Sequence, residues 1–111
     1  MKKVLIIDAP PLFREFLKEK LSAEKIEVDI AHGNRDAFTK LLSQLPELVI
    51  VNSPDNFQDL LDFLDKKRSD PNASKIPVIL TGPVLEQDQL RVLPSYGVIK
   101  YFNKYIKLLT N

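Results

Sequence analysis

The run Leu48-Val49-Ile50-Val51-Asn52 decides the fold of this chain, because four apolar residues stand in succession and a polar residue follows at once. A strand without polar alternation is buried on both faces, which is typical of the centre of a parallel sheet. Residues 4–7 repeat the pattern as Val-Leu-Ile-Ile and end at Asp8, and residues 77–81 repeat it as Pro-Val-Ile-Leu-Thr. The sequence therefore predicts a parallel sheet that contains these segments as strands.

Amphipathic segments separate these strands. One helix is predicted where apolar residues recur at helical offsets and charged residues fill the other face, at Leu12, Phe13, Phe16, Leu17 and Leu21. Residues 26–30 alternate between apolar and acidic side chains, as expected of an edge or half-exposed strand. The remaining pattern predicts helices over residues 37–45, 57–64 and 85–93 and a last strand over residues 98–102.

The same periodicity assigns individual side chains. The helix expected at residues 57–64 has an apolar stripe of Phe57, Leu60, Leu61 and Leu64. Phe63 is expected at the margin of that stripe, partly exposed, and the basic run at residues 66–68 is expected to be a solvated helix end. Asn34 is expected to cap the helix over residues 37–45. Either Asp55 or Asn56 is expected to cap the helix over residues 57–64.

Strands that alternate with helices along 111 residues favour one α/β domain, residues 1–111. Right-handed crossovers favour a three-layer, flavodoxin-like, doubly wound five-stranded parallel sheet in the order 2-1-3-4-5. Only seven residues follow Lys104, so we expect a shortened last helix, or a chain truncated there. A short helix would leave apolar surface on the first helix or the sheet less covered, and such a patch is often a partner or dimer surface.

Composition excludes several classes of ligand and metal site. The net charge is +1, which gives no whole-molecule field for nucleic acid or an anionic membrane. The chain has no cysteine and one histidine, His32, which we expect in a surface turn, so thiolate and histidine-rich metal centres are excluded within one chain. The apolar runs are too short for a signal peptide or a membrane span, and the expected location is cytoplasmic.

The residues at the predicted strand ends carry a family resemblance. They are Asp8, Asn52, Thr81 and the pair Asn103-Lys104. With the segments 3–8, 46–52 and 76–82 and the later Gly97, Tyr101 and Lys104, they resemble the receiver domains of bacterial two-component response regulators. The resemblance covers nearly the whole chain. It implies a site where an aspartate accepts phosphate beside magnesium, a hydroxyl residue and a lysine.

Three positions depart from that pattern. The acceptor position is Asn52, Ala9 follows Asp8 where a second acid is usual, and Tyr105 follows Lys104 in place of proline. An amide is a poor phosphate acceptor, and one aspartate holds magnesium weakly. We therefore expect a degenerate phosphorylation site at Asp8, Asn52, Thr81 and Lys104, with no bound metal, no cofactor and no enzymatic activity.

Asp8 and Lys104 each permit more than one interpretation. Asp8 is a residual metal ligand, a solvated strand end or a cap of the first helix, and Lys104 either pairs with Asp8 or stays exposed. Thr81 fits its position as a small hydroxyl residue.

The resemblance implies a function through protein partners. In this family the fourth helix, fifth strand and fifth helix often carry partner contacts, which makes Tyr96, Tyr101, Tyr105 and Ile106 interface candidates. The sequence thus favours a phosphorylation-independent pseudo-receiver that binds a signalling protein or a second copy of itself. The alternatives are a working receiver phosphorylated on Asp8 or Asp55, and a small-ligand binder, although residues 8–11, Asp-Ala-Pro-Pro, lack the glycines of a phosphate cradle.

Overall fold

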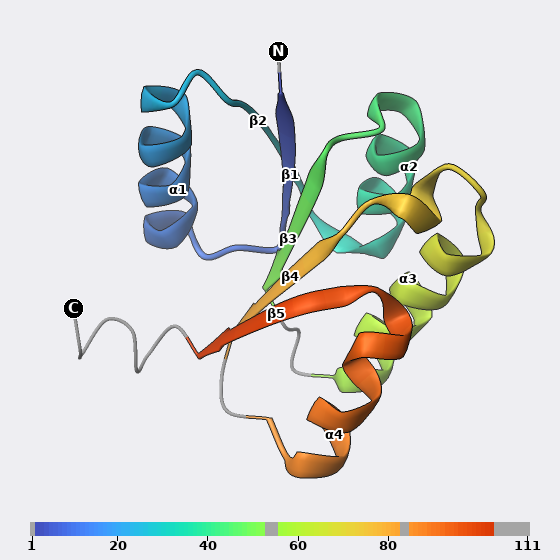
Figure 1. Ribbon diagram of the computed structural model, residues 1–111. Helices are drawn as coiled ribbons and strands as arrows, with labels where there is room; N and C mark the ends of the chain where they lie inside the picture. Colours follow the sequence, from blue (N-terminus) through green and yellow to red (C-terminus); the bar gives the residue numbers. More distant parts are fainter. Residues whose placement is uncertain (1, 53–55, 83–84, 104–111) are drawn as a thin grey trace.

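Apolar strands and amphipathic helices assemble into a sandwich in which a parallel sheet lies between two helical layers (Figure 1). The computed structural model describes residues 2–52, 56–82 and 85–103. In chain order the elements are β1 (Lys3–Ile7), α1 (Pro11–Ala23), β2 (Glu27–Ala31), α2 (Gly33–Gln44), β3 (Leu48–Asn52), α3 (Phe57–Ser69), the 3-10 turn η1 (Ala73–Lys75), β4 (Val78–Gly82), α4 (Gln87–Val92), the 3-10 turn η2 (Leu93–Tyr96) and β5 (Val98–Asn103).

The sheet has the strand order β2-β1-β3-β4-β5, and every neighbouring pair is parallel. This confirms the predicted doubly wound, flavodoxin-like architecture. The apolar runs form the three central strands because helices cover both of their faces. The predicted last helix, with Lys104, Tyr105 and Ile106, lies outside the described residues. Within the described ranges, no helix has the length and apolar character needed to cross a lipid bilayer.

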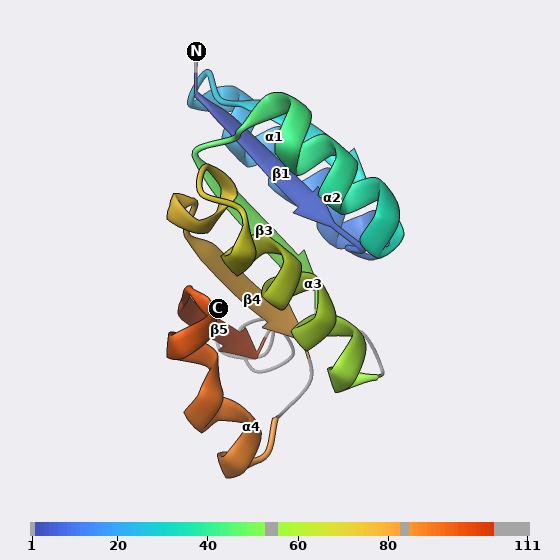
Figure 2. The ribbon, with the colours of Figure 1, turned by 90° about the vertical axis from the view of Figure 1, so that its right-hand side faces the viewer.

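Two apolar clusters fill the space on either side of the sheet. α1 covers one face, where its Phe13, Leu17 and Leu21 pack around Ile6 and Ile50. Helices α2, α3 and α4 lie on the opposite side (Figures 1 and 2). The larger cluster is there, and it joins side chains of α2 and α3 to those of β3 and β4.

The sheet-facing stripe of α3 differs from the predicted one. Phe63 is 2% exposed and Lys67 is 1% exposed, so both expectations of exposure were wrong. The buried residues of α3 are Leu60, Phe63, Leu64 and Lys67, which follow one another at offsets of three, four and seven from the first. That spacing is a single helical face, whereas Leu61 lies beside it and is half-buried.

The apolar stripe of α1 is also narrower than predicted. Leu12 is 89% exposed and Phe16 is 53% exposed. Phe13, Leu17 and Leu21, which are four residues apart, are sufficient to cover the sheet, and Leu12 and Phe16 lie one residue before two of them. Leu12 and Phe16 therefore leave apolar surface exposed on the first helix, outside the stripe that packs on the sheet.

Helix ends show further differences. α2 begins at Gly33, with His32 as its exposed N-cap residue, so the prediction that Asn34 caps this helix was wrong. Asn56 caps α3, since its side chain accepts a hydrogen bond from the Gln58 amide at 2.9 Å. The helix expected over residues 85–93 is shorter: α4 ends at Val92, and the chain continues as η2, which has a proline in its first turn.

A bulge interrupts the pairing of β4 with β5. Val98 pairs with Val78, but the next pair is Lys100 with Ile79, so Ile99 is skipped. Ile99 is 64% exposed. Beyond the bulge, Tyr101 returns to the core face that Val98 occupies, although these two residues are an odd number of positions apart.

Candidate functional site

The carboxyl ends of the strands meet at one edge of the sheet, as predicted. Ile7 pairs with Val51, so Asp8 and Asn52 each follow a paired residue on neighbouring strands. On the next strand Thr81 pairs directly with Asn52. The structure therefore brings Asp8, Asn52 and Thr81 to the same sheet edge, while Lys104 lies outside the described residues.

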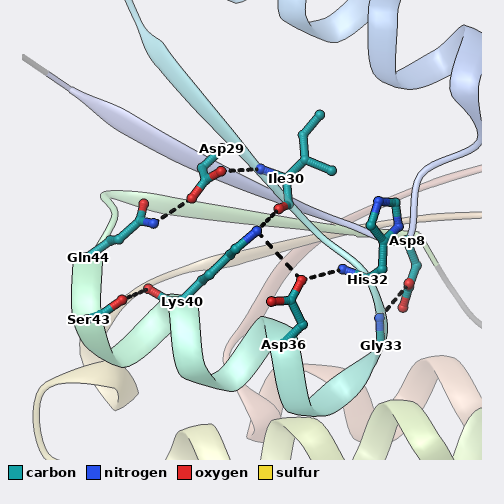
Figure 3. Close-up of polar contacts among 9 residues, drawn as sticks. All are labelled: Asp8, Asp29, Ile30, His32, Gly33, Asp36, Lys40, Ser43 and Gln44. Atoms are coloured by element: carbon teal, nitrogen blue, oxygen red, sulfur yellow. Dashed lines mark hydrogen bonds and ion pairs between the residues drawn. The ribbon is translucent and has the colours of Figure 1, made fainter.

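The carboxylate of Asp8 is bonded to the start of α2 (Figure 3). Its Oδ1 accepts a hydrogen bond from the amide of Gly33 at 2.9 Å, and Gly33 is the first residue of that helix. Asp8 has a φ of 58° and its own amide donates to the Ala31 carbonyl at 3.0 Å. Helix N-termini favour negative charge, so this contact stabilises both partners. Asp8 thus bonds to the start of α2 and not to the start of α1, which was one of its three interpretations: the N-cap residue of α1 is Pro10, and no side-chain hydrogen bond caps that helix.

Thr81 and Asn52 belong to the packed end of the sheet. Thr81 is 4% exposed, and its Oγ1 donates a long hydrogen bond of 3.4 Å to the carbonyl of Val51. Asn52 is half-buried at the end of β3. The Thr81 hydroxyl therefore has a structural partner in the neighbouring strand, in agreement with its interpretation as a small hydroxyl that fits the position.

The described residues at the carboxyl ends of the strands do not supply a donor set that fits a magnesium ion. Magnesium takes hard oxygen ligands and binds through carboxylates in near-octahedral geometry. Asp8 is the one carboxylate that the described strand ends supply, and its Oδ1 is bonded to α2, while Ala9 is a buried apolar residue. Across the described ranges, no three histidine or acidic side chains come together as metal ligands would.

The two described interface candidates are held against the core. The ring of Tyr96 packs against the larger cluster and lies under the guanidinium of Arg68, with the Arg68 Cζ 4.3 Å from the ring centre. Arg68 is fixed in turn by Asp65, at 2.6 Å, and by the Ser95 carbonyl, at 3.4 Å. Sequence reasoning missed this arginine, although it is on the last turn of α3 beside the buried Lys67.

Tyr101 packs against the same cluster. Burial raises the pKa of the Tyr101 phenol, and a hydrogen bond with the main chain of Leu85 opposes that rise. The ring is half-buried, and the contact with Leu85 joins β5 to the segment that precedes α4. Tyr101 is therefore a packing residue that couples two elements of the expected interface.

In the region of α4, η2 and β5, the exposed apolar residues are not Tyr96 and Tyr101. Ile99 on β5 and Val92 on α4 are 64% and 39% exposed. Ile99 is exposed because it is the bulged residue, and no local sequence pattern predicted the bulge. On the opposite helical layer, Leu12 and Phe16 form a second exposed pair. Tyr105 and Ile106 lie outside the described residues.

Comparisons with known proteins place the fold. No family model matches the sequence, and no curated protein matches it. Solved structures do match. The chemotaxis protein CheY4 of Vibrio cholerae is 19% identical, with 99% of this chain and 95% of that one covered and a TM-score of 0.79. A response regulator receiver protein from Pseudomonas putida is 22% identical, with 97% and 92% covered and a TM-score of 0.79. A two-component response regulator from Clostridium difficile is 22% identical, with 98% and 91% covered and a TM-score of 0.78. The chain therefore has the fold of receiver domains.

Proposed function

We propose that this chain is a pseudo-receiver: a protein-interaction or regulatory module of bacterial two-component signalling that works without phosphorylation and without catalysis. Its receiver fold and the order of its strand-end residues support a signalling role. Independence of phosphorylation is supported by the chemistry and contacts of two side chains. Asn52 stands where an acceptor aspartate is expected, and the carboxylate of Asp8 is bonded to Gly33.

The chemistry of these groups supports phosphorylation independence. The acceptor that the receiver pattern implies is a charged aspartate carboxylate, whereas the amide of Asn52 carries no full negative charge on its oxygen and is a poor nucleophile. Phosphoryl transfer also needs positive charge to neutralise the transferred group. With Ala9 in place of an acid, the described residues of this edge do not assemble a magnesium site.

The partner in this proposal is a protein, and the contact surface is formed by α4, η2 and β5. Exposed Val92 and Ile99 supply apolar contact area there. Tyr96 and Tyr101 support the surface from beneath, because both rings pack against the core. The net charge of +1 argues against nucleic acid as the ligand of this domain. Tyr105 and Ile106 stay predicted members of the surface.

Incubation with acetyl phosphate and magnesium, followed by intact-mass measurement, tests the proposal. We expect no phosphoryl adduct on the wild-type chain. A stoichiometric adduct would overturn the proposal, and mapping it to Asp8 or Asp55 would support a working receiver with an unusual acceptor. Because Asn52-Ser53 is a plausible deamidation sequence, freshly purified protein is compared with aged protein, so that an aspartate formed at position 52 is recognised.

A pull-down from the native cell tests the partner surface. Wild-type protein is compared with Ile99→Glu, which places a charge on the proposed surface, and with Lys18→Glu, an exposed change on α1, which packs on the other face of the sheet. We expect the first variant to lose the captured protein and the second to retain it. Equal capture by all three proteins would show that the proposed surface is wrong.

A further inference from the structure

The free edge of β2 is covered by side chains. β2 is the outermost strand of the sheet, and such a strand presents unpaired main-chain groups to which another chain can add a strand. The Glu27 amide donates into the β1 side at 2.8 Å, and the Ala31 carbonyl accepts from that side at 3.0 Å. Since the direction of main-chain groups alternates along a strand, Val28 and Ile30 direct theirs away from the sheet.

Both outward groups of Ile30 have partners within the chain (Figure 3). Asp29 Oδ1 accepts from the Ile30 amide at 2.8 Å, and Lys40 Nζ on α2 donates to the Ile30 carbonyl. The next outward amide belongs to His32 and donates to Asp36 Oδ2 at 3.0 Å. Three successive hydrogen-bonding groups of this edge are therefore already used.

Further contacts hold these capping side chains in place. The Gln44 side-chain amide donates to Asp29 Oδ2, and Lys40 Nζ lies 3.6 Å from Asp36 Oδ2. Burial raises the pKa of Asp29, but hydrogen bonds from Gln44 and Ile30 and the positive charge of Lys40 outweigh it and hold that pKa below its ordinary value. Asp29 is thus kept as a carboxylate acceptor by Ile30 on its own strand and by Gln44 and Lys40, which come from consecutive turns of α2.

We propose that these α2 side chains, together with Asp29, form a clasp that closes the β2 edge against a second copy of this chain. An incoming β2 strand would have to separate Lys40 and Asp29 from Ile30, which leaves charged groups without their partners. It would also bring the acidic Glu27 and Asp29 of both copies to one ladder, where like charges destabilise pairing. The clasp therefore directs self-association of the chain away from this edge.

Amide hydrogen exchange of the intact chain, followed by NMR, tests the capping contacts. Val28 is the internal reference, because its outward amide has no side-chain partner among the described residues. After correction for intrinsic rates, we expect the Ile30 and His32 amides to exchange at least tenfold more slowly than that of Val28. Asp29→Ala should bring Ile30 to the Val28 rate and leave His32 protected. An Ile30 amide that exchanges as fast as Val28 in the wild-type chain would overturn the proposal.

Sedimentation velocity over a range of concentrations tests the closure itself. The double variant Asp29→Ala/Lys40→Ala is compared with Lys18→Ala/Glu19→Ala, which removes the same charges at exposed positions on α1. We expect self-association at least tenfold stronger in the first variant than in the control, with the Val28 amide becoming protected. If the double variant does not fold, Lys40→Met keeps the aliphatic stem, removes the donor and should show the same direction. Self-association equal to that of the control would refute the closure.

Discussion

Lys67 in the last turn of α3 reaches the main chain at Gly97, where its Nζ lies 3.9 Å from the position that a Cβ would occupy. Gly97 leads from η2 into β5, so the ammonium group of Lys67 lies close to the point where the edge strand begins. Lys67 is 1% exposed, and among the described residues no carboxylate lies within ion-pair distance of it. Burial therefore lowers the pKa of its ammonium group.

Replacing Lys67 with methionine should stabilise the fold by roughly 1 kcal/mol, because a side chain of similar length fills the same space without burying a charge. Lys67→Ala should instead destabilise it by about 2 kcal/mol through the cavity that it leaves. Urea unfolding of the three proteins at neutral pH measures both changes. Equal loss of stability in the two variants would mean that the ammonium group itself is required.

The same residue predicts a dependence of stability on pH. In the unfolded chain Lys67 titrates near 10.5, whereas in the folded chain its pKa is lower. Between these two values the unfolded chain holds more protons, so stability from this group rises as pH increases through that window. Relative to Lys67→Met, the wild-type chain should gain unfolding free energy as pH approaches 10.5. Parallel curves for the two proteins over the alkaline range would contradict this expectation.

Restoring acidic residues at the strand ends should restore cation binding in part. We expect Ala9→Asp/Asn52→Asp to bind magnesium in isothermal titration, because two added carboxylates supply the charge and oxygen ligands that the ion prefers. Asn52→Asp alone should bind more weakly, and the wild-type chain more weakly still. If the wild-type chain bound magnesium as tightly as the double variant, the lack of acids at positions 9 and 52 would not be what limits binding.

Removing the carboxylate of Asp8 should weaken α2 at its first turn. Asp8→Ala is expected to cost about 1 kcal/mol of unfolding free energy, the usual scale for losing a side-chain acceptor at a helix N-terminus. Glu19→Ala serves as the control, since Glu19 is exposed on α1 beyond its first turn. Thermal unfolding measures the difference. An Asp8 variant as stable as the control would show that the Gly33 contact contributes nothing.

The Arg68–Tyr96 contact should be a modest contributor. Arg68→Ala is expected to lower stability by about 1 kcal/mol, the scale of a partly exposed cation–π pair. Arg68→Lys keeps the charge but loses the planar contact with the ring, so it should recover only part of that loss. Chemical unfolding at low and high salt checks both values, and full recovery with lysine would show that charge alone is responsible.

The sheet could be predicted from sequence because its central strands are short, apolar and separated by amphipathic helices. The side of a helix that packs on the sheet was harder to predict where a charged residue occupies a buried position. Lys67 lies seven residues after Leu60 on the same face as Phe63, but a lysine in a basic run is ordinarily solvated. A search for helical spacing that ignored charge would have placed Phe63 correctly.

The candidate site was predictable in its residues and less so in their partners. Strand ends of a parallel sheet meet at one edge, so Asp8, Asn52 and Thr81 follow from topology. The partner of Asp8 is Gly33, which is 25 residues away along the chain and belongs to a helix beyond the neighbouring strand. Such a contact depends on how α2 begins, and helix boundaries are poorly fixed by sequence.

The skipped Ile99 in β5 reverses the parity of every residue after it. Deleting that one residue would restore regular alternation and keep Tyr101 opposite Leu80 and Phe102 opposite Thr81. If Ile99 instead paired with Ile79 as an ordinary strand residue, every later residue would change sides, and the phenol that touches Leu85 would turn toward the layer of α1. The extra residue thus sets the frame of the strand, and an alignment that counts Ile99 as a paired position would misassign both aromatic rings.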